Sequence, residues 1–158
     1  MNAKHTGIPP HVTLVNRFET NSIQTIIEKL KELYIEDITI HITRISYFLD
    51  PAILYFDIEN TLQTVHEDIL DVIKPHVNPI TRFKSDALTQ KQKEFLEVYG
   101  SPFVKEFYHP HISLTSNHAD PDLFKDAIKN LPQISFKTKA KLAIIIKTQD
   151  AWEVNYLN

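Results

Sequence analysis

The chain contains no cysteine among its 158 residues. This excludes disulfides, thiolate nucleophiles and metal centres with cysteine ligands. It has only two glycines, Gly7 and Gly100, far apart in the sequence. Walker loops and dinucleotide-binding fingerprints need clustered glycines that let the backbone approach a phosphate. Any phosphate bound by this protein must therefore be held by side chains.

Long apolar runs and an excess of positive charge are also missing. No stretch approaches the ~20 apolar residues of a membrane span, and the first ten residues lack the apolar core of a signal peptide. The formal net charge of −3 argues against a broad basic surface for long duplexes and fits a small nucleotide or a strand end better. We expect a cytoplasmic, monomeric, single-domain protein without membrane contact that buries roughly 70% of its unfolded surface.

Two short segments, one hundred positions apart, have nearly the same sequence: His11-Val12-Thr13-Leu14 and His111-Ile112-Ser113-Leu114. In an extended strand, alternate side chains share a face. Each histidine is then expected to lie beside its hydroxyl residue on one face, with the two apolar residues pointing into a core.

The chain also repeats its broader pattern at this offset. Each motif is followed by an amphipathic run typical of a helix, then by two β-rich runs separated by a turn. These runs are 22–33, 38–49 and 52–58 in the first half, and 121–131, 134–148 and 151–157 in the second. The pattern predicts an α+β, bilobal fold: two pseudo-symmetric β-α-β-β lobes, about 8–60 and 106–158, with antiparallel sheets around a central cleft. The alternative is a chance likeness between two α+β segments.

A helical insert, about 61–105, separates the two predicted lobes. Residues 61–74 have apolar side chains along one face and predict a helix that stops near Pro75. A strand is expected around 80–83. Residues 89–99 predict a short charged helix with Thr89 as its N-cap and Gly100 as its stop.

Paired histidines and hydroxyls fit one kind of chemistry. An imidazole titrates near a pH of about 6.5, so a neutral ring can take a proton from water while a protonated one gives a proton to a departing oxygen. Phosphodiester cleavage needs both transfers. The Thr13 and Ser113 hydroxyls can donate hydrogen bonds to the non-bridging phosphate oxygens. The scheme requires neither a metal nor another cofactor.

The two motifs, read with their preceding prolines as Pro9-Pro10-His11-Val12-Thr13-Leu14 and Pro110-His111-Ile112-Ser113-Leu114, resemble those of the two-histidine (2H) phosphoesterase superfamily. The resemblance is to its 2′-5′ RNA ligase-like and cyclic phosphodiesterase branch, and it covers most of the chain. The second motif has serine where many relatives have threonine, which is a mild chemical change.

The resemblance implies two lobes around a concave cleft and metal-independent cleavage of 2′,3′-cyclic phosphates, or of 2′-5′ or 3′-terminal linkages, in nucleotides or RNA. Its site residues would be His11 and His111 as the acid-base pair and Thr13 and Ser113 as the phosphate holders. The substrate, the choice between ligation and hydrolysis, and the division of roles between the two histidines stay open. The alternative to an enzyme is a nucleotide or RNA-end binding module that uses the same cleft without turnover.

Other residues invite weaker interpretations. Arg17 could reach a phosphate, and Tyr108 or Phe48 could stack on a base, although aromatic residues in strands usually belong to a core. His41-Ile42-Thr43 repeats the motif spacing but is followed by arginine, so His41 is interpreted as an exposed or half-buried strand residue. His66 is interpreted as a surface or helix position. His109 and His111 form a metal-capable pair that lacks an acidic partner.

Overall fold

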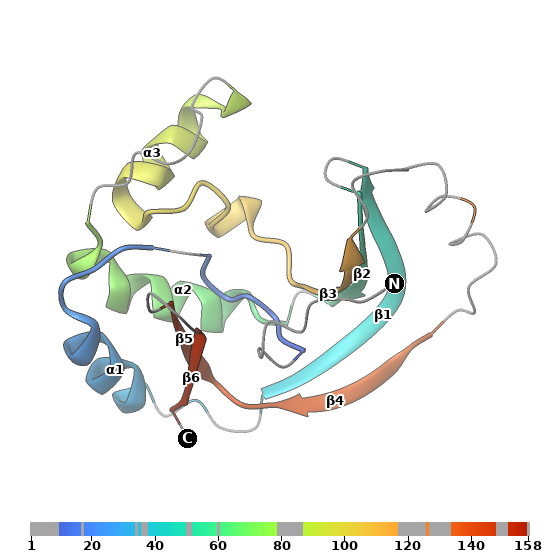
Figure 1. Cartoon of the computed structure of the whole chain (residues 1–158), viewed down its shortest axis with the longest axis horizontal. Coiled ribbons are helices and arrows are strands. Elements are labelled where there is room, and N and C mark those ends of the chain that lie inside the picture. The colour runs from blue at the N-terminus through green and yellow to red at the C-terminus, as the bar shows by residue number, and fades with distance from the viewer. Residues whose placement is uncertain are drawn as a thin grey trace. The chain divides into compact units, whose positions relative to one another are not determined.

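The computed structural model describes residues 10–16, 18–33, 35, 38–49, 52–59, 61–78, 87–116, 126, 134–147 and 152–157. Within them the fold is α+β with antiparallel sheets, as the sequence predicts (Figure 1). In chain order the elements are α1 (Ile23–Glu32), β1 (Ile38–Leu49), β2 (Ala52–Ile58), α2 (Gln63–Ile73), η1 (Lys74–His76), α3 (Gln90–Tyr99), η3 (Lys105–Phe107), β3 (His111–Ser116), β4 (Phe136–Ala140), β5 (Ala143–Lys147) and β6 (Trp152–Tyr156).

The described residues fall into two compact units. Unit 1 takes its residues from 1–13, 37–61 and 110–156, and contains all the strands. Unit 2 takes its residues from 14–36, 62–109 and 157–158, and contains α1, α2 and α3. Both predicted motif histidines, His11 and His111, therefore belong to unit 1.

Unit 1 is built on a four-stranded antiparallel sheet in the order β3-β2-β1-β4, with β5 and β6 forming a separate two-stranded sheet. Figure 1 shows the long strand β1 between β2 and β4. Ile38, Ile40 and Ile42 alternate along β1 and are buried together with Ile58 of β2. This period of two gives the sheet one apolar face, and leaves the opposite face to polar side chains.

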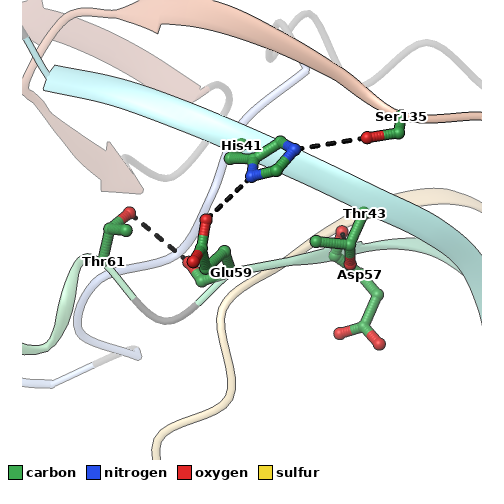
Figure 2. Close-up of polar contacts among 6 residues, drawn as sticks. All are labelled: His41, Thr43, Asp57, Glu59, Thr61 and Ser135. Carbon is green, nitrogen blue, oxygen red and sulfur yellow. Dashed lines mark hydrogen bonds and ion pairs between the residues drawn. The ribbon is translucent and has the colours of Figure 1, made fainter.

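A β-bulge between Ile42 and Arg44 interrupts this alternation. On either side of it, Ile42 pairs with Ile58 and Arg44 pairs with Asp57. Adjacent residues of β2 point to opposite faces, so Arg44 lies on the face opposite to Ile42. At the bulge the Thr43 hydroxyl donates to the Asp57 carbonyl oxygen at 3.2 Å (Figure 2).

Unit 2 is a small helical assembly in which α1 and η3 pack on α2. Its core includes Ile26 of α1, Leu70 of α2 and Val104, which have no exposed surface. The helix predicted over 61–74 is confirmed: α2 ends at Ile73, and Pro75 lies in the short turn η1.

Helix α3 confirms the prediction for 89–99. Thr89 forms a capping box with Gln92, in which each side chain bonds the other residue's backbone. Gly100 ends the helix in the left-handed conformation, with φ of 69°. Glycine adopts this conformation without the steric cost that a Cβ atom imposes.

Two strand predictions need correction. The first motif forms no strand: residues 11–13 have no regular structure, and 14–15 lie in a bend. The preceding Pro10 is not the reason, because Pro110 precedes the second motif in the same way and that motif forms β3. A strand forms only where a partner strand accepts its hydrogen bonds, and residues 11–13 pair with none of the described strands. Over the described residues 134–147, the second predicted run is not one strand but two: β4 pairs with Ile38–Ile42 of β1, and β5 then pairs with β6.

Strands from both predicted lobes share the four-stranded sheet, since β1 and β2 come from the first and β3 and β4 from the second. Asp126, which is helical, is the one described residue of the predicted helix 121–131, and the predicted strand at 80–83 lies outside the described residues. The division into pseudo-symmetric lobes stays a prediction. No helix in the described part of the chain has the length and apolar character needed to cross a bilayer.

Candidate active site

The second motif lies on β3, at one edge of the four-stranded sheet. His111 pairs with Asp57 of β2, and Ser113 pairs with Tyr55. Directly opposed residues of an antiparallel pair share a face. We call the face that carries His111 and Ser113 the polar face of the sheet. Ser113 is exposed on it and His111 is half-buried, so both side chains are accessible to a ligand.

The first motif keeps the predicted alternation without forming a strand. His11 and Thr13 are exposed, whereas Val12 and Leu14 are half-buried. The two side chains with acid-base and hydrogen-bonding chemistry are thus directed toward solvent. Together with the second motif in unit 1, they give one compact unit two imidazoles and two hydroxyls.

An aromatic contact packs the His111 ring against β2. The Tyr55 ring approaches it edge-on, with centroids 5.4 Å apart and an interplanar angle of 68°. Burial raises the pKa of Tyr55 above its usual value, and the Asp57 carboxylate adds to this effect. Tyr55 therefore stays protonated at neutral pH, and it is hydrogen-bonded to the Ser46 side chain. The contact limits how far the His111 ring can rotate.

An ion pair lies beside His111 on the polar face of the sheet. The Arg44 Nε donates to Asp57 Oδ2 at 2.8 Å, and the Asp57 side chain is 11% exposed while that of Arg44 is 65% exposed. Asp57 thus lies between Arg44 on β1 and His111 on β3. This pair belongs to neither sequence motif. The predicted strands 38–49 and 52–58 held the signal, because pairing Leu49 with Ala52 brings Arg44 opposite Asp57.

His41 is held by two polar contacts of its own (Figure 2). Its Nδ1 lies 2.7 Å from Glu59 Oε2, and its Nε2 lies 3.2 Å from the Ser135 hydroxyl. The side chain is 30% exposed and belongs to β1. The interpretation of His41 as a half-buried strand residue is confirmed. Its contacts tie β1 to the end of β2 and to the residue that precedes β4.

The three weaker candidates differ in what the structure shows of them. Arg17 and the Phe48 side chain lie outside the described residues. Tyr108 belongs to unit 2, where it is 9% exposed and its ring stacks on His66 with centroids 4.1 Å apart. Because one face of the Tyr108 ring is already covered, stacking on a base would have to use the other face. The substrate contacts of all three residues stay predictions.

The interpretation of His66 as a surface or helix position is right about the helix and wrong about the surface, because His66 lies in helix α2 with no exposed surface. It shares the apolar stripe of α2 because it follows Leu62 by four residues and precedes Ile69 by three. The same spacing in the sequence could have shown that it is buried. Across the described ranges, no three acidic or histidine side chains are grouped so that they could hold a metal ion together.

Comparison with known proteins places these features in a family. The model of the 2′-5′ RNA ligase superfamily matches residues 2–150 of the chain. The protein therefore belongs to this superfamily, which is part of the wider 2H phosphoesterase superfamily. The resemblance inferred from the two motifs is confirmed. No match was found among curated proteins or among solved structures.

Proposed function

We propose that the protein is a metal-independent phosphodiesterase that acts on 2′,3′-cyclic phosphates, or on 2′-5′ or 3′-terminal linkages, of nucleotides or RNA. The observation that carries the proposal is the family match over residues 2–150, which includes both motifs. The histidines and hydroxyl residues of both motifs belong to unit 1, which supports the idea that they serve a single site. Two imidazoles are sufficient for both proton transfers, so the reaction needs no metal ion.

In the proposed hydrolysis of a cyclic phosphate, neutral His111 accepts a proton from water as the water oxygen attacks phosphorus. The bond from phosphorus to the 2′ or 3′ oxygen breaks, and protonated His11 donates its proton to that oxygen. The Thr13 and Ser113 hydroxyls donate hydrogen bonds to the non-bridging oxygens, whose charge grows in the transition state. One proton enters the pair and one leaves it, so the two histidines end with their protonation states exchanged.

The edge-on Tyr55 ring packs against one side of the His111 ring, which supports a defined orientation of His111 for proton transfer. In the ligating direction the same groups exchange roles by microscopic reversibility. The proposal also includes the two predicted lobes around a cleft, because that arrangement would bring His11 and His111 to one phosphorus atom.

The test is turnover of a 2′,3′-cyclic nucleotide in the presence of a chelator. We expect a bell-shaped dependence of kcat/KM on pH, since one imidazole must be neutral and the other protonated. His11→Ala and His111→Ala should each lower kcat/KM by about 10²- to 10⁴-fold. His41→Ala is the matched control and should keep its activity, because His41 is engaged by Glu59 and Ser135.

Three results would contradict this proposal. Saturable binding of the nucleotide without product would favour the binding module. Loss of turnover in the chelator would favour a metal-dependent reaction. A loss from His41→Ala as large as that from His111→Ala would mean that the wrong pair of histidines had been chosen.

A further inference from the structure

Cationic side chains lie on the polar face of the four-stranded sheet, beyond the second motif. The register places them there: Asp57 pairs with His111 on one side and with Arg44 on the other. His41 lies on the same face as Arg44, across the bulge, and pairs with Lys137 of β4. The polar face thus carries Ser113 and His111 on β3 and Arg44 on β1. It also carries Lys137 and Lys139 on β4, since Lys139 pairs with Thr39, two residues before His41.

The ion pair with Asp57 orients the Arg44 side chain, and most of that side chain remains accessible to a ligand. Its Nε is fixed on the carboxylate of Asp57, which is nearly buried, while the Arg44 side chain is 65% exposed. Within the described part of the chain, the guanidinium donates no other hydrogen bond. A guanidinium has further N–H donors in a rigid planar fork that matches phosphate oxygens. The contact with Asp57 lowers the entropy that Arg44 would lose on binding a phosphate.

The charges on this face favour an anionic ligand, but not through Arg44 alone. Asp57 offsets much of the Arg44 charge, so Arg44 contributes directed hydrogen bonds more than net charge. Lys137 is exposed on β4 and supplies positive charge with its flexible stem. Glu59 is engaged by His41. Neighbouring strands are about 4.8 Å apart, so β1 lies about 10 Å and β4 about 14 Å from the strand of the second motif.

We propose that the polar face binds the sugar-phosphate backbone of an RNA strand whose end reacts at the second motif. Arg44 contacts the phosphate next to the reacting one, and Lys137 contacts a phosphate further along the strand. This inference rests on the proposed function and narrows its substrate class. Oligonucleotides with at least two further phosphates are the substrates, in preference to cyclic mononucleotides.

The test compares kcat/KM for a 2′,3′-cyclic mononucleotide with kcat/KM for a tetranucleotide that ends in a 2′,3′-cyclic phosphate. We expect the native protein to prefer the tetranucleotide through a lower KM. Lys137→Gln and Arg44→Gln should each reduce that preference about fivefold to tenfold, by raising the KM for the tetranucleotide. Arg44→Lys should give an intermediate loss, because it keeps the charge without the fork.

Binding of the same tetranucleotide, followed by fluorescence anisotropy at several salt concentrations, gives a second measurement. Each removed cation should reduce the slope of log K against log salt by about 0.7. Lys31→Gln is the control, because Lys31 is exposed on α1 in unit 2 and carries the same charge change. It should alter neither the substrate preference nor the slope.

Arg44→Gln breaks the ion pair with Asp57 and could therefore disturb the fold. Lys137→Gln leaves that ion pair intact, so its effect on the substrate preference reports on binding. Equal turnover of both substrates by the native protein would overturn the inference, and so would a Lys137→Gln variant that keeps the native preference and slope. Failure to turn over either substrate would contradict the proposed function instead. In that case the salt slopes of Lys137→Gln and Lys31→Gln still decide whether the face binds the strand.

Discussion

Two histidines outside the predicted catalytic pair show how burial changes the role of the same side chain. His66 in unit 2 has no exposed surface. Its Nδ1 lies 2.6 Å from the Leu14 carbonyl oxygen, and its Nε2 accepts from the Lys105 backbone N–H at 3.0 Å. A carbonyl oxygen can only accept and a backbone N–H can only donate. The ring is therefore held as the neutral tautomer that carries its proton on Nδ1.

His41 in unit 1 also uses both ring nitrogens, but its partners and its exposure differ. The Glu59 carboxylate faces Nδ1 and the Ser135 hydroxyl faces Nε2. A hydroxyl can donate or accept, so these contacts fit the neutral and the protonated ring alike. With the His41 and Glu59 side chains 30% and 56% exposed, water competes for every bond. The comparison indicates that His66 stabilises the fold and that His41 contributes little.

Replacement of each histidine by alanine tests this difference and has the largest expected effect. His66→Ala removes a fully buried side chain, leaves the part-buried Leu14 carbonyl and Lys105 N–H without this partner, and opens a cavity, so the free energy of unfolding should fall by about 3–5 kcal/mol. His41→Ala should cost less than about 1 kcal/mol. Urea denaturation followed by circular dichroism measures both values. Equal losses of unfolding free energy in the two variants would show that burial does not explain a difference in stability between His66 and His41.

The dependence of stability on pH sharpens the comparison further. Burial lowers the pKa of His66 below its usual value, while the bond to the Leu14 carbonyl partly opposes this shift. Between these two pKa values, His66 binds a proton in the unfolded chain but not in the folded protein. The free energy of unfolding should be greatest above pH ~6.5 and should fall at lower pH, by up to about 1.4 kcal/mol per pH unit, down to the lowered pKa.

His66→Gln provides the control for this pH effect, because glutamine can still donate and accept but does not titrate. The difference in unfolding free energy between the native protein and His66→Gln should shrink as the pH falls from 7 to 5. A difference that stays constant over this range would mean that His66 titrates as it does in the unfolded chain, and a difference that grows as the pH falls would mean that His66 is protonated in the folded protein.

The smallest expected effect comes from Tyr108, which stacks on His66. Its hydroxyl is buried and has no hydrogen-bond partner among the described residues, and burial raises its pKa. Tyr108→Phe removes an unpaired polar group and keeps the ring stack, so it should stabilise the protein by about 1 kcal/mol. Thermal unfolding measures the change. Tyr156→Phe is the control, because its side chain is 57% exposed, and its unfolding free energy should stay within about 0.5 kcal/mol of that of the native protein. A destabilised Tyr108→Phe variant would instead mean that the Tyr108 hydroxyl has a hydrogen-bond partner outside the described residues.

Local sequence signals predicted the elements that depend on local chemistry. The strands 38–49 and 52–58 occur with the predicted bounds, and α3 begins after Thr89 and ends at Gly100. Side-chain period, N-caps and glycine conformation act within a few residues, so they can be seen in one segment. The first motif and the run 134–148 could not be predicted in this way, because a strand forms only where a partner strand accepts its hydrogen bonds.

The site shows the same division. The two motifs were found by their residue types and spacing alone, and they were sufficient to identify the family. Arg44 and Asp57 gave no motif, since their relation to His111 depends on register across three strands. The proposed contact of Arg44 with a neighbouring phosphate therefore became visible only in the paired sheet.

By itself, the sequence determined which side chains are available for chemistry, the family, and the helices and hairpin that short-range patterns specify. The tertiary structure decided which histidine is buried, which polar residues face His111, and where the second long run divides. The physical reason is that burial, strand register and ion pairing depend on atoms distant in the chain. Their positions follow from packing as a whole, and no short segment contains that information.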